Sequence, residues 1–211
     1  MNRERDDPDA ALADADAVGD AAWSELVDTL IASRRSFAPR RIGDPGPDAD
    51  QLARLFAAAA AAPDHGQLLP WRFVIVPADK RERLAEAFAQ SLLDRDPAAS
   101  PQDVQLARAK AHNCPLVMLA IARFGEPDAE VSNLERVVSL GAAIQNLLLA
   151  AHGMGLAGGL AGGRALRSHH LRKLFGLAPN EHPVCFVLVG TALGREPSRL
   201  RPTMDAFVSE L

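Results

Sequence analysis

Residues 62–71 read Ala62-Pro63-Asp64-His65-Gly66-Gln67-Leu68-Leu69-Pro70-Trp71 and separate an alanine-rich helical segment from an apolar run. Two prolines stiffen this loop, and Trp71 leads into residues 72–76, which have the composition of a β-strand. A second stretch, Arg34-Arg35-Ser36, follows an earlier helical segment. Its two guanidinium groups and hydroxyl suit a phosphate or another planar anion. Together, the anion clamp and the polar loop predict a bound phosphorylated cofactor.

The size and composition of the chain predict one globular domain with a substantial core. It has 211 residues, of which 48% are hydrophobic, and this is enough to bury a core in a single domain. Cys114 and Cys185 are too few and too far apart for a disulfide framework. We expect both to be buried thiols in a reducing, cytoplasmic environment.

The acidity of the chain is concentrated at its N-terminus. Residues 1–20 hold seven acidic and two basic side chains, whereas the whole chain has a net charge of −4. This composition predicts a disordered acidic tail before a folded domain over residues 21–211, although a functional acidic arm is an open alternative. A signal peptide is excluded because no apolar region follows a basic start. We expect no membrane span and, without a basic stripe, no nucleic-acid partner.

Hydrophobic periodicity predicts a mixture of helices and strands. The expected helices cover residues 23–33, 48–62, 78–93, 102–112, 133–152 and 168–175, and the expected strands cover 71–76, 116–122 and 184–189. Strict βαβ repetition is missing, so the α+β class is favoured. The almost uncharged face of the helix over 133–152 should be buried in the core or in a subunit interface. The glycine-rich run 153–163 trails a helix and lacks a following Lys-Ser/Thr, so it predicts a helix cap and turn more strongly than a phosphate loop.

The order of these landmarks resembles the FMN-dependent nitroreductase family, especially its small bacterial members whose loop reads Ala-Pro-Asp-His. The matching pieces are Arg34-Arg35-Ser36, the loop 62–71, the long apolar helix with its glycine-rich exit, and residues 187–191. The resemblance implies a central, mainly antiparallel sheet flanked by helices, in an interlocked homodimer with two FMN molecules at its interface. It also implies hydride transfer from NAD(P)H to an electron-poor small molecule such as a nitroaromatic or a quinone.

The same resemblance assigns roles to individual positions. Arg34, Arg35 and Ser36 would hold the FMN phosphate and ribityl chain, and Arg195 would also reach the phosphate. His65 and Gln67 fall at flavin-contacting positions. The end of the long helix corresponds to a stretch assigned to the nicotinamide nucleotide, namely Ala150, Ala151, His152, Gly153, Met154 and Gly155. No side chain is assigned as an obligatory acid or base.

The chain departs from the family pattern in its predicted flavin contacts. Close relatives have Trp-Arg-Ser-Gly after the glycine-rich exit, whereas this chain has Leu160, Ala161, Gly162 and Gly163. An aromatic ring and a positive charge are lost, but the backbone amides of Ala161 and Gly162 can still donate to a flavin oxygen. The departure keeps a second hypothesis open. The chain could be an FMN-binding or flavin-sequestering dimer without redox activity, or a member that has lost tight FMN binding.

Several residues also have simpler interpretations. Arg34 and Arg35 could complement the dipole of a helix C-terminus in solvent. His65 could cap the loop, and Asp64 is favoured as a turn residue over a catalytic one. The histidines at positions 112, 152, 169, 170 and 182 lack ligand-like spacing with acids or cysteines, so the sequence predicts no metal site.

Overall fold

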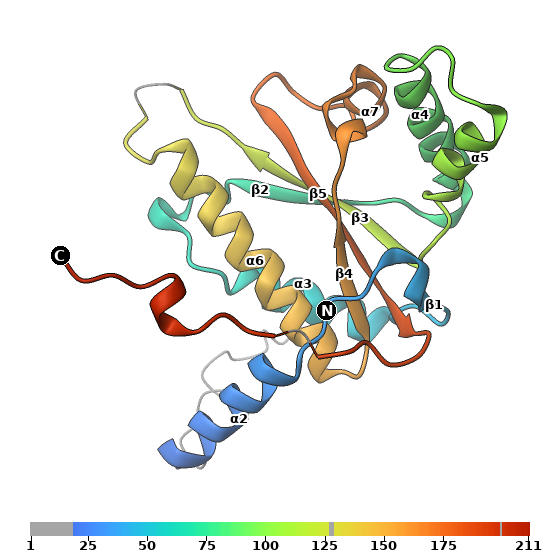
Figure 1. Cartoon of the computed structure of the whole chain (residues 1–211). Helices are drawn as coiled ribbons and strands as arrows, with labels where there is room; N and C mark the ends of the chain where they lie inside the picture. The colour runs from blue at the N-terminus through green and yellow to red at the C-terminus, as the bar shows by residue number, and fades with distance from the viewer. Residues whose placement is uncertain (1–18, 127–128, 199) are drawn as a thin grey trace, which may run out of the picture. The chain divides into compact units, whose positions relative to one another are not determined.

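The computed structural model describes residues 19–126, 129–198 and 200–211 (Figure 1). The chain forms two compact units, the first ending at Arg34 and the second spanning Arg35–Leu211. Helix α2 (Asp20–Ser33) belongs to the first unit and confirms the helix predicted over residues 23–33. The predicted disordered tail lies outside the described residues, apart from residues 19 and 20. The division into a tail and a single folded domain therefore stays a prediction.

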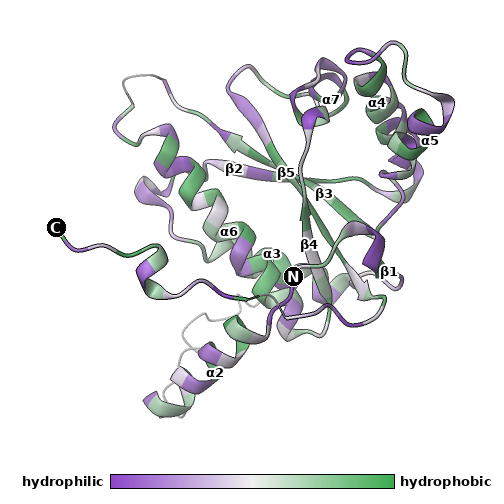
Figure 2. Ribbon diagram, viewed as in Figure 1, coloured by the Kyte–Doolittle hydropathy of each residue, from purple (hydrophilic) through white to green (hydrophobic). Residues whose placement is uncertain are grey.

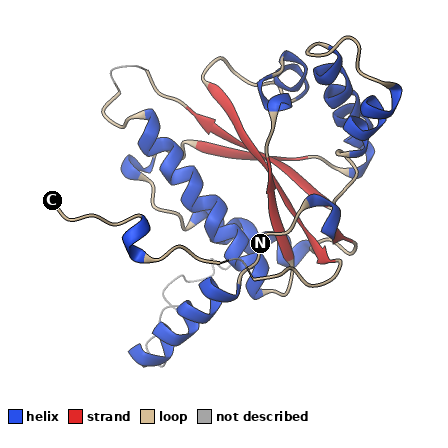
Figure 3. Cartoon of the chain, in the orientation of Figure 1, coloured by secondary structure: helices blue, strands red, loops and turns tan. Residues whose placement is uncertain are grey.

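A five-stranded sheet forms the centre of the second unit (Figure 3). Its strands are β1 (Ile42–Gly43), β2 (Trp71–Ile75), β3 (Leu116–Arg123), β4 (Ala157–Ala161) and β5 (Glu181–Ala192). The order is β1-β5-β3-β2, with β4 also paired to β5, and every strand pair is antiparallel. β5 pairs with β3, β4 and β1. The α+β class and the mainly antiparallel sheet are confirmed.

Helices cover both faces of this sheet. Those of the second unit are α3 (Ala49–Ala60), α4 (Arg81–Leu93), α5 (Pro101–Ala109), α6 (Asn133–Gly153) and α7 (His169–Leu174). Alternate residues of β3 face opposite ways, as a strand requires. Met118 and Ala120 pack with α3 and α6, whereas Leu119 and Ile121 pack with α4 and α7. Short 3₁₀ helices lie between these elements: η2 (Pro39–Arg41), η3 (His65–Gln67), η4 (Ala78–Lys80), η5 (Arg164–Arg167) and η6 (Met204–Ala206).

Helix α6 is long and apolar enough to cross a membrane by length and composition. The expectation of no membrane span did not anticipate such a segment. Its apolar face is nevertheless used inside the fold, because Leu140, Leu147 and Ala151 are fully or almost fully buried against the sheet and α3. Figure 2 shows the hydrophobic stripe along α6. These contacts are those of a core helix.

Both cysteines are buried and free, as predicted. Burial raises the pKa of the Cys114 thiol and of the Cys185 thiol to about 11. Both therefore stay protonated near neutral pH and are poor nucleophiles, since the thiolate is the reactive form.

Two strands depart from the expectation for their segments. Residues 157–161 form β4 inside the glycine-rich run that predicted only a cap and a turn, and Ile42–Gly43 form β1 in a segment for which no strand was expected. Residues 157–161 hold none of the β-branched residues that favour strands, and β1 has only Ile42. Both form strands because the long strand β5 supplies their hydrogen-bonding partners.

Candidate functional site

The segment that carries Arg35 and Ser36 lies against the outer edge of β4. Ser36 forms a parallel bridge with Gly158, and the Phe37 amide donates a hydrogen bond to the Gly158 carbonyl over 3.0 Å. A Cβ atom at Gly159 would lie 2.1 Å from the Phe37 carbonyl oxygen. Only glycine permits so close an approach of the two backbones. The glycine-rich run therefore fixes the predicted anion-binding residues Arg35 and Ser36 beside β4.

Arg41 connects this segment to the chain that follows β5. Its guanidinium donates to the Arg195 carbonyl over 3.0 Å and forms an ion pair with Glu196 at 3.2 Å. The Leu193 amide also donates to the Arg41 carbonyl over 2.9 Å. Arg195 is thus tied to the segment that carries Ser36. Sequence reasoning missed Arg41, because a contact across 154 residues leaves no local signal.

The exit of β4 separates residues that the sequence grouped together. Leu160 is 46% exposed, whereas its neighbour Ala161 packs on the opposite side, toward α4 and α7. Beyond them, Cβ atoms at Gly162 and Gly163 would meet nothing within 4 Å. The backbone at Gly162 is therefore open, and a ligand contacting Leu160 would meet a different face from one contacting the Ala161 methyl group.

A cavity of about 990 Å³ opens beside Ala161 and Gly162, on the side of the sheet covered by α4. Its wall includes residues of η2, α4, α5 and η5, but none of Arg35, Ser36, His65 or Arg195. Of the residues predicted to bind the cofactor, the cavity is therefore lined only by Ala161 and Gly162 at the end of β4. We place the candidate site on the donors beside β4, because they have the chemistry that a phosphate requires.

The loop with Asp64 and His65 is closed by its own hydrogen bonds. The Asp64 carboxylate accepts from the Leu69 amide over 2.7 Å, which confirms its predicted role as a turn residue. Gln67 and Leu69 have φ angles of 52° and 44°. Positive φ is costly for residues with side chains and is found most often at functional sites. The loop therefore holds Gln67 in a backbone conformation that local preference alone would not select.

His65 lies at the N-terminal end of α6. Its Nδ1 atom is 3.1 Å from the Glu135 carboxylate. Hydrogen bonds from the Ser132 side chain and backbone, together with the contact to His65, lower the pKa of Glu135 to about 2. Glu135 is therefore ionised at neutral pH and can orient the His65 ring by accepting a hydrogen bond from its Nδ1–H group.

The loop and the anion-binding segment lie at different levels along α6. Gly158, which holds Ser36, packs next to Leu148, whereas His65 contacts Glu135. Leu148 and Glu135 are thirteen residues apart in the helix, and this corresponds to roughly 20 Å along its axis. The structure brings Arg35 and Ser36 to β4 and links them to the Arg195 backbone, but it does not bring His65 or Gln67 to them.

The last turn of α6 presents only some of the residues assigned to a nicotinamide nucleotide. His152 and Met154 are half-buried, and Gly153 and Gly155 are exposed, the latter with a φ angle of 77°. Ala150 is half-buried. Ala151 is fully buried and its carbonyl accepts from the Leu156 amide, so its side chain cannot contact a ligand. The assignment of Ala151 is corrected because core packing occupies that face of the helix.

Arg34 is the C-cap residue of α2 and the last residue of the first unit. Its predicted role at a phosphate stays a prediction.

Residues 31–191 match the model of the nitroreductase family. The chain is 28% identical over 173 residues to a "Putative NAD(P)H nitroreductase" of Haemophilus influenzae, covering 82% of this chain and 92% of the relative. A protein of the same description from Escherichia coli K12 is 29% identical over 164 residues, covering 77% and 86% respectively.

Solved structures share the fold. A nitroreductase-like protein from Bacillus cereus superposes with a TM-score of 0.75 at 19% identity, covering 88% of this chain and 95% of that one. An FMN and NADPH-dependent nitroreductase from Sphigopyxis sp. strain HMH gives a TM-score of 0.66 at 19% identity, covering 87% and 98%.

Proposed function

The chain belongs to the nitroreductase family of oxidoreductases, and from this premise we propose that it is an FMN-dependent enzyme of the cytoplasm. In this proposal, hydride passes from NAD(P)H through FMN to an electron-poor acceptor such as a nitroaromatic or a quinone. The names of the relatives from Haemophilus influenzae and Escherichia coli support NAD(P)H as the donor. The FMN and NADPH-dependent structural relative supports the cofactor.

The observation that carries the proposal is the donor set held beside β4. Arg35 and Ser36 supply a guanidinium group and a hydroxyl, and the bridge from Ser36 to Gly158 holds the backbone of this segment beside β4 before any ligand binds. A phosphate dianion is matched by such donors, and their prior placement lowers the entropic cost of binding. Arg195 can add a second guanidinium, since Arg41 ties its backbone to the same segment.

The residues present therefore fit an FMN phosphate. Arg35, Ser36 and Arg195 would hold the phosphate, and the exposed Leu160 side chain with the open backbone at Gly162 would lie along the flavin. The protein would contribute orientation and hydrogen bonds, whereas the cofactor supplies the redox chemistry. His152, Gly153, Met154 and Gly155 are the accessible residues of the stretch assigned to NAD(P)H.

We further propose that the complete flavin site needs two copies of the chain. His65 and Gln67 lie at the other end of α6 from Ser36, and a homodimer would allow the loop of one copy to face the anion-binding segment of the other. The exposed apolar side chains support such a dimer: Leu134 and Val138 of α6 are 79% and 71% exposed, and Met204 and Phe207 near the C-terminus are 71% and 70% exposed. Apolar groups exposed in this way favour association with a partner surface.

The test is an absorption spectrum of the purified protein after addition of FMN, recorded anaerobically before and after NADH or NADPH. The proposal predicts bound flavin that loses its yellow colour with at least one of the two nucleotides, and regains it when a quinone or nitroaromatic compound is added. Bound flavin that stays oxidised with both nucleotides would favour the second hypothesis, a flavin-sequestering dimer. A chain that binds no FMN would contradict both.

A further inference from the structure

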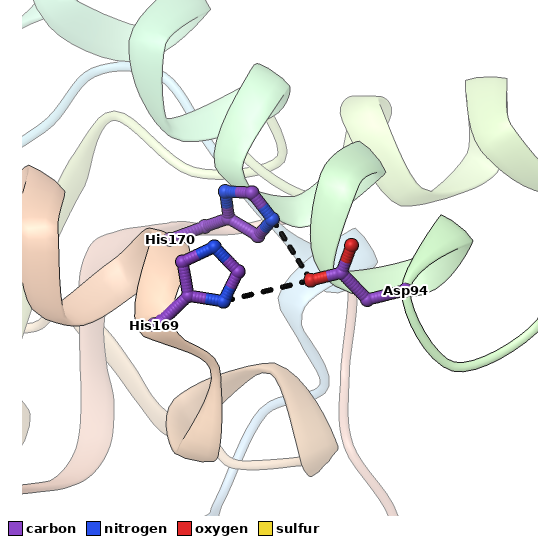
Figure 4. A group of neighbouring side chains, drawn as sticks. All are labelled: Asp94, His169 and His170. Atoms are coloured by element: carbon purple, nitrogen blue, oxygen red, sulfur yellow. Dashed lines mark hydrogen bonds and ion pairs between the residues drawn. The ribbon is translucent and has the colours of Figure 1, made fainter.

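The end of α4 and the start of α7 bring together three side chains that can bind a metal. Asp94 follows the last residue of α4, and His169 and His170 are the first two residues of α7. One ligand atom from each residue lies within 4.8 Å of the other two (Figure 4). Sequence spacing did not reveal the group, because Asp94 is 76 residues from His170.

The distances are close to those that a small cation needs. The Asp94 Oδ2 atom lies 2.9 Å from Nε2 of His170 and 3.6 Å from Nδ1 of His169. Tetrahedral ligands at about 2.1 Å from a metal are separated by roughly 3.4 Å. The two distances from Asp94 Oδ2 thus bracket this value, and the His169 and His170 rings, whose centroids are 3.9 Å apart, would rotate to bring one nitrogen each to a shared cation.

The backbone around the group is already fixed. The buried Ser91 hydroxyl of α4 forms a 2.6 Å hydrogen bond with the Ser168 hydroxyl, and Ser168 also caps α7 by accepting from the Leu171 amide. These bonds hold the end of α4 next to the start of α7. Supporting hydrogen bonds of this kind pre-organise a metal site and strengthen its affinity.

The electrostatic setting differs between the two elements. The last turn of α4 presents the negative end of its helix dipole at Asp94, whereas the two histidines stand at the positive end of the short helix α7. The nearest arginine in sequence, Arg95, donates to the Ser91 carbonyl over 2.9 Å, so this guanidinium nitrogen is engaged by the helix end. Two imidazoles and one carboxylate are ligands that divalent transition metals prefer, whereas Mg²⁺ and Ca²⁺ prefer an all-oxygen set.

We propose that Asp94, His169 and His170 bind one divalent transition-metal cation of the Zn²⁺ class. The site has three protein ligands on two elements, and its exposure leaves room for water in the remaining coordination position. A cation bound there would cross-link α4 to α7. It is separate from the proposed flavin site, so each proposal can fail without the other.

The test uses the full chain without a histidine tag, freed of metal with EDTA and titrated calorimetrically with Zn²⁺ at constant neutral pH. We expect one Zn²⁺ per chain. Asp94→Ala, His169→Ala and His170→Ala should each weaken binding by at least about tenfold. His112→Ala is the matched control, because His112 faces Glu82 at 3.7 Å in an exposed pair that belongs to no group of three potential ligands among the described residues. It should bind as the parent does.

Thermal unfolding gives a second readout. Zn²⁺ should raise the melting temperature of the parent by several degrees and leave that of His169→Ala unchanged, because a ligand stabilises only the state that binds it. The His169 side chain is 72% exposed. Without metal, the His169→Ala variant and the parent should therefore have the same melting temperature. Unchanged Zn²⁺ affinity in two of the three cluster variants, or equal loss in His112→Ala, would overturn the proposal. Equal affinity for Mg²⁺ would overturn the assigned class of metal.

Discussion

The proposed anion-binding role of Arg35 and Ser36 depends on the backbone pairing of Ser36 with Gly158. A hydroxyl and a guanidinium group in sequence suit an anion, but many exposed helix ends carry the same groups. The bridge from Ser36 to Gly158 distinguishes this pair, because it brings their backbone beside β4, where Gly159 leaves room for the Phe37 carbonyl. The predicted function rests on that placement.

The first prediction concerns this pair. Arg35→Ala with Ser36→Ala should weaken FMN binding by at least about tenfold, since a hydrogen bond to a charged group contributes roughly 1.5–3 kcal/mol. FMN fluorescence titration measures the effect. Arg83→Ala, an exposed arginine of α4, is the control and should bind FMN as the parent does. Equal affinity in the double variant and the parent would refute the phosphate assignment.

Leu160 and Ala161 lead to a second prediction at this scale. Leu160→Trp should increase FMN affinity, because the exposed side chain at this position would gain aromatic contact area against the flavin. Ala161→Arg should not help, since the Ala161 methyl group faces the α4 side of the sheet. The same titration separates the two variants. A gain with Ala161→Arg alone would mean that the flavin lies on that other side.

Glu181 forms a buried charge cluster outside the candidate site. Arg72 donates to both of its carboxylate oxygens, over 2.7 and 2.8 Å, and Arg123 contacts it at 3.3 Å. Hydrogen bonding from Arg72 is the main cause that lowers the pKa of Glu181 to about 2 from its ordinary value of 4.5. Its stabilising contribution is therefore complete above about pH 4.5 and is lost as pH falls toward 2.

The third prediction follows from the lowered pKa of Glu181. Glu181→Gln should lower the urea midpoint at pH 7, because two arginines lose their counter-charge, and should reduce the part of the acid destabilisation that lies between pH 4.5 and 2. Urea unfolding of parent and variant at several pH values tests it. Glu210→Gln, at an exposed position, is the control and should have the same urea midpoint as the parent at each pH. If the urea midpoints of Glu181→Gln and the parent changed with pH in the same way, the assigned role of Glu181 would be contradicted.

At the scale of elements, β4 positions the site. Its pairing with β5 on one edge and its contact with Ser36 on the other leave no room for a side chain at Gly159. Gly159→Ala would bring a methyl group to 2.1 Å from the Phe37 carbonyl oxygen, so the two backbones must separate.

The fourth prediction is that Gly159→Ala lowers the melting temperature and weakens FMN binding together. Strain of this kind costs on the order of 1–3 kcal/mol. Gly162→Ala is the matched control for stability, because a methyl group there meets nothing within 4 Å. Its melting temperature should stay close to that of the parent. A Gly159→Ala variant with parental stability and affinity would show that the contact between Phe37 and β4 does not hold the site.

The sequence predicted the long elements well, because their periodicity and caps agree. Asp48 caps α3 through a capping box with Gln51, and Pro63 follows the end of that helix. β3 is apolar from Leu116 to Ala122 and lies between β2 and β5. β4 could not be predicted, because Ala157–Ala161 forms a strand only through its pairing with β5 and through close contacts that small residues allow.

The sequence likewise predicted some residues of the candidate site and missed others. Arg35, Ser36 and the loop of His65 have local chemical signals, and their segments occur where helices end. The link from Arg41 to Arg195 and Glu196, the cluster of Asp94 with His169 and His170, and the burial of Ala151 depend on contacts between distant segments. No local pattern carries such information.

At the scale of the whole molecule, the central claim is that the anion-binding segment and the loop of His65 are two halves of one FMN site and come from different copies of the chain. Within one copy they lie at opposite ends of α6. Light scattering should therefore give twice the 22.5 kDa chain mass. The claim requires more than a dimer, because each copy must complete the site of the other.

Co-expression of two defective variants tests this claim most directly. One carries Arg35→Ala with Ser36→Ala, the other His65→Ala with Gln67→Ala, and each alone is expected to retain little FMN. In a mixed dimer, one site would combine the intact segment of one copy with the intact loop of the other. Random pairing should then restore FMN to about a quarter of all sites. FMN content no higher than in the two separate variants would contradict the shared site.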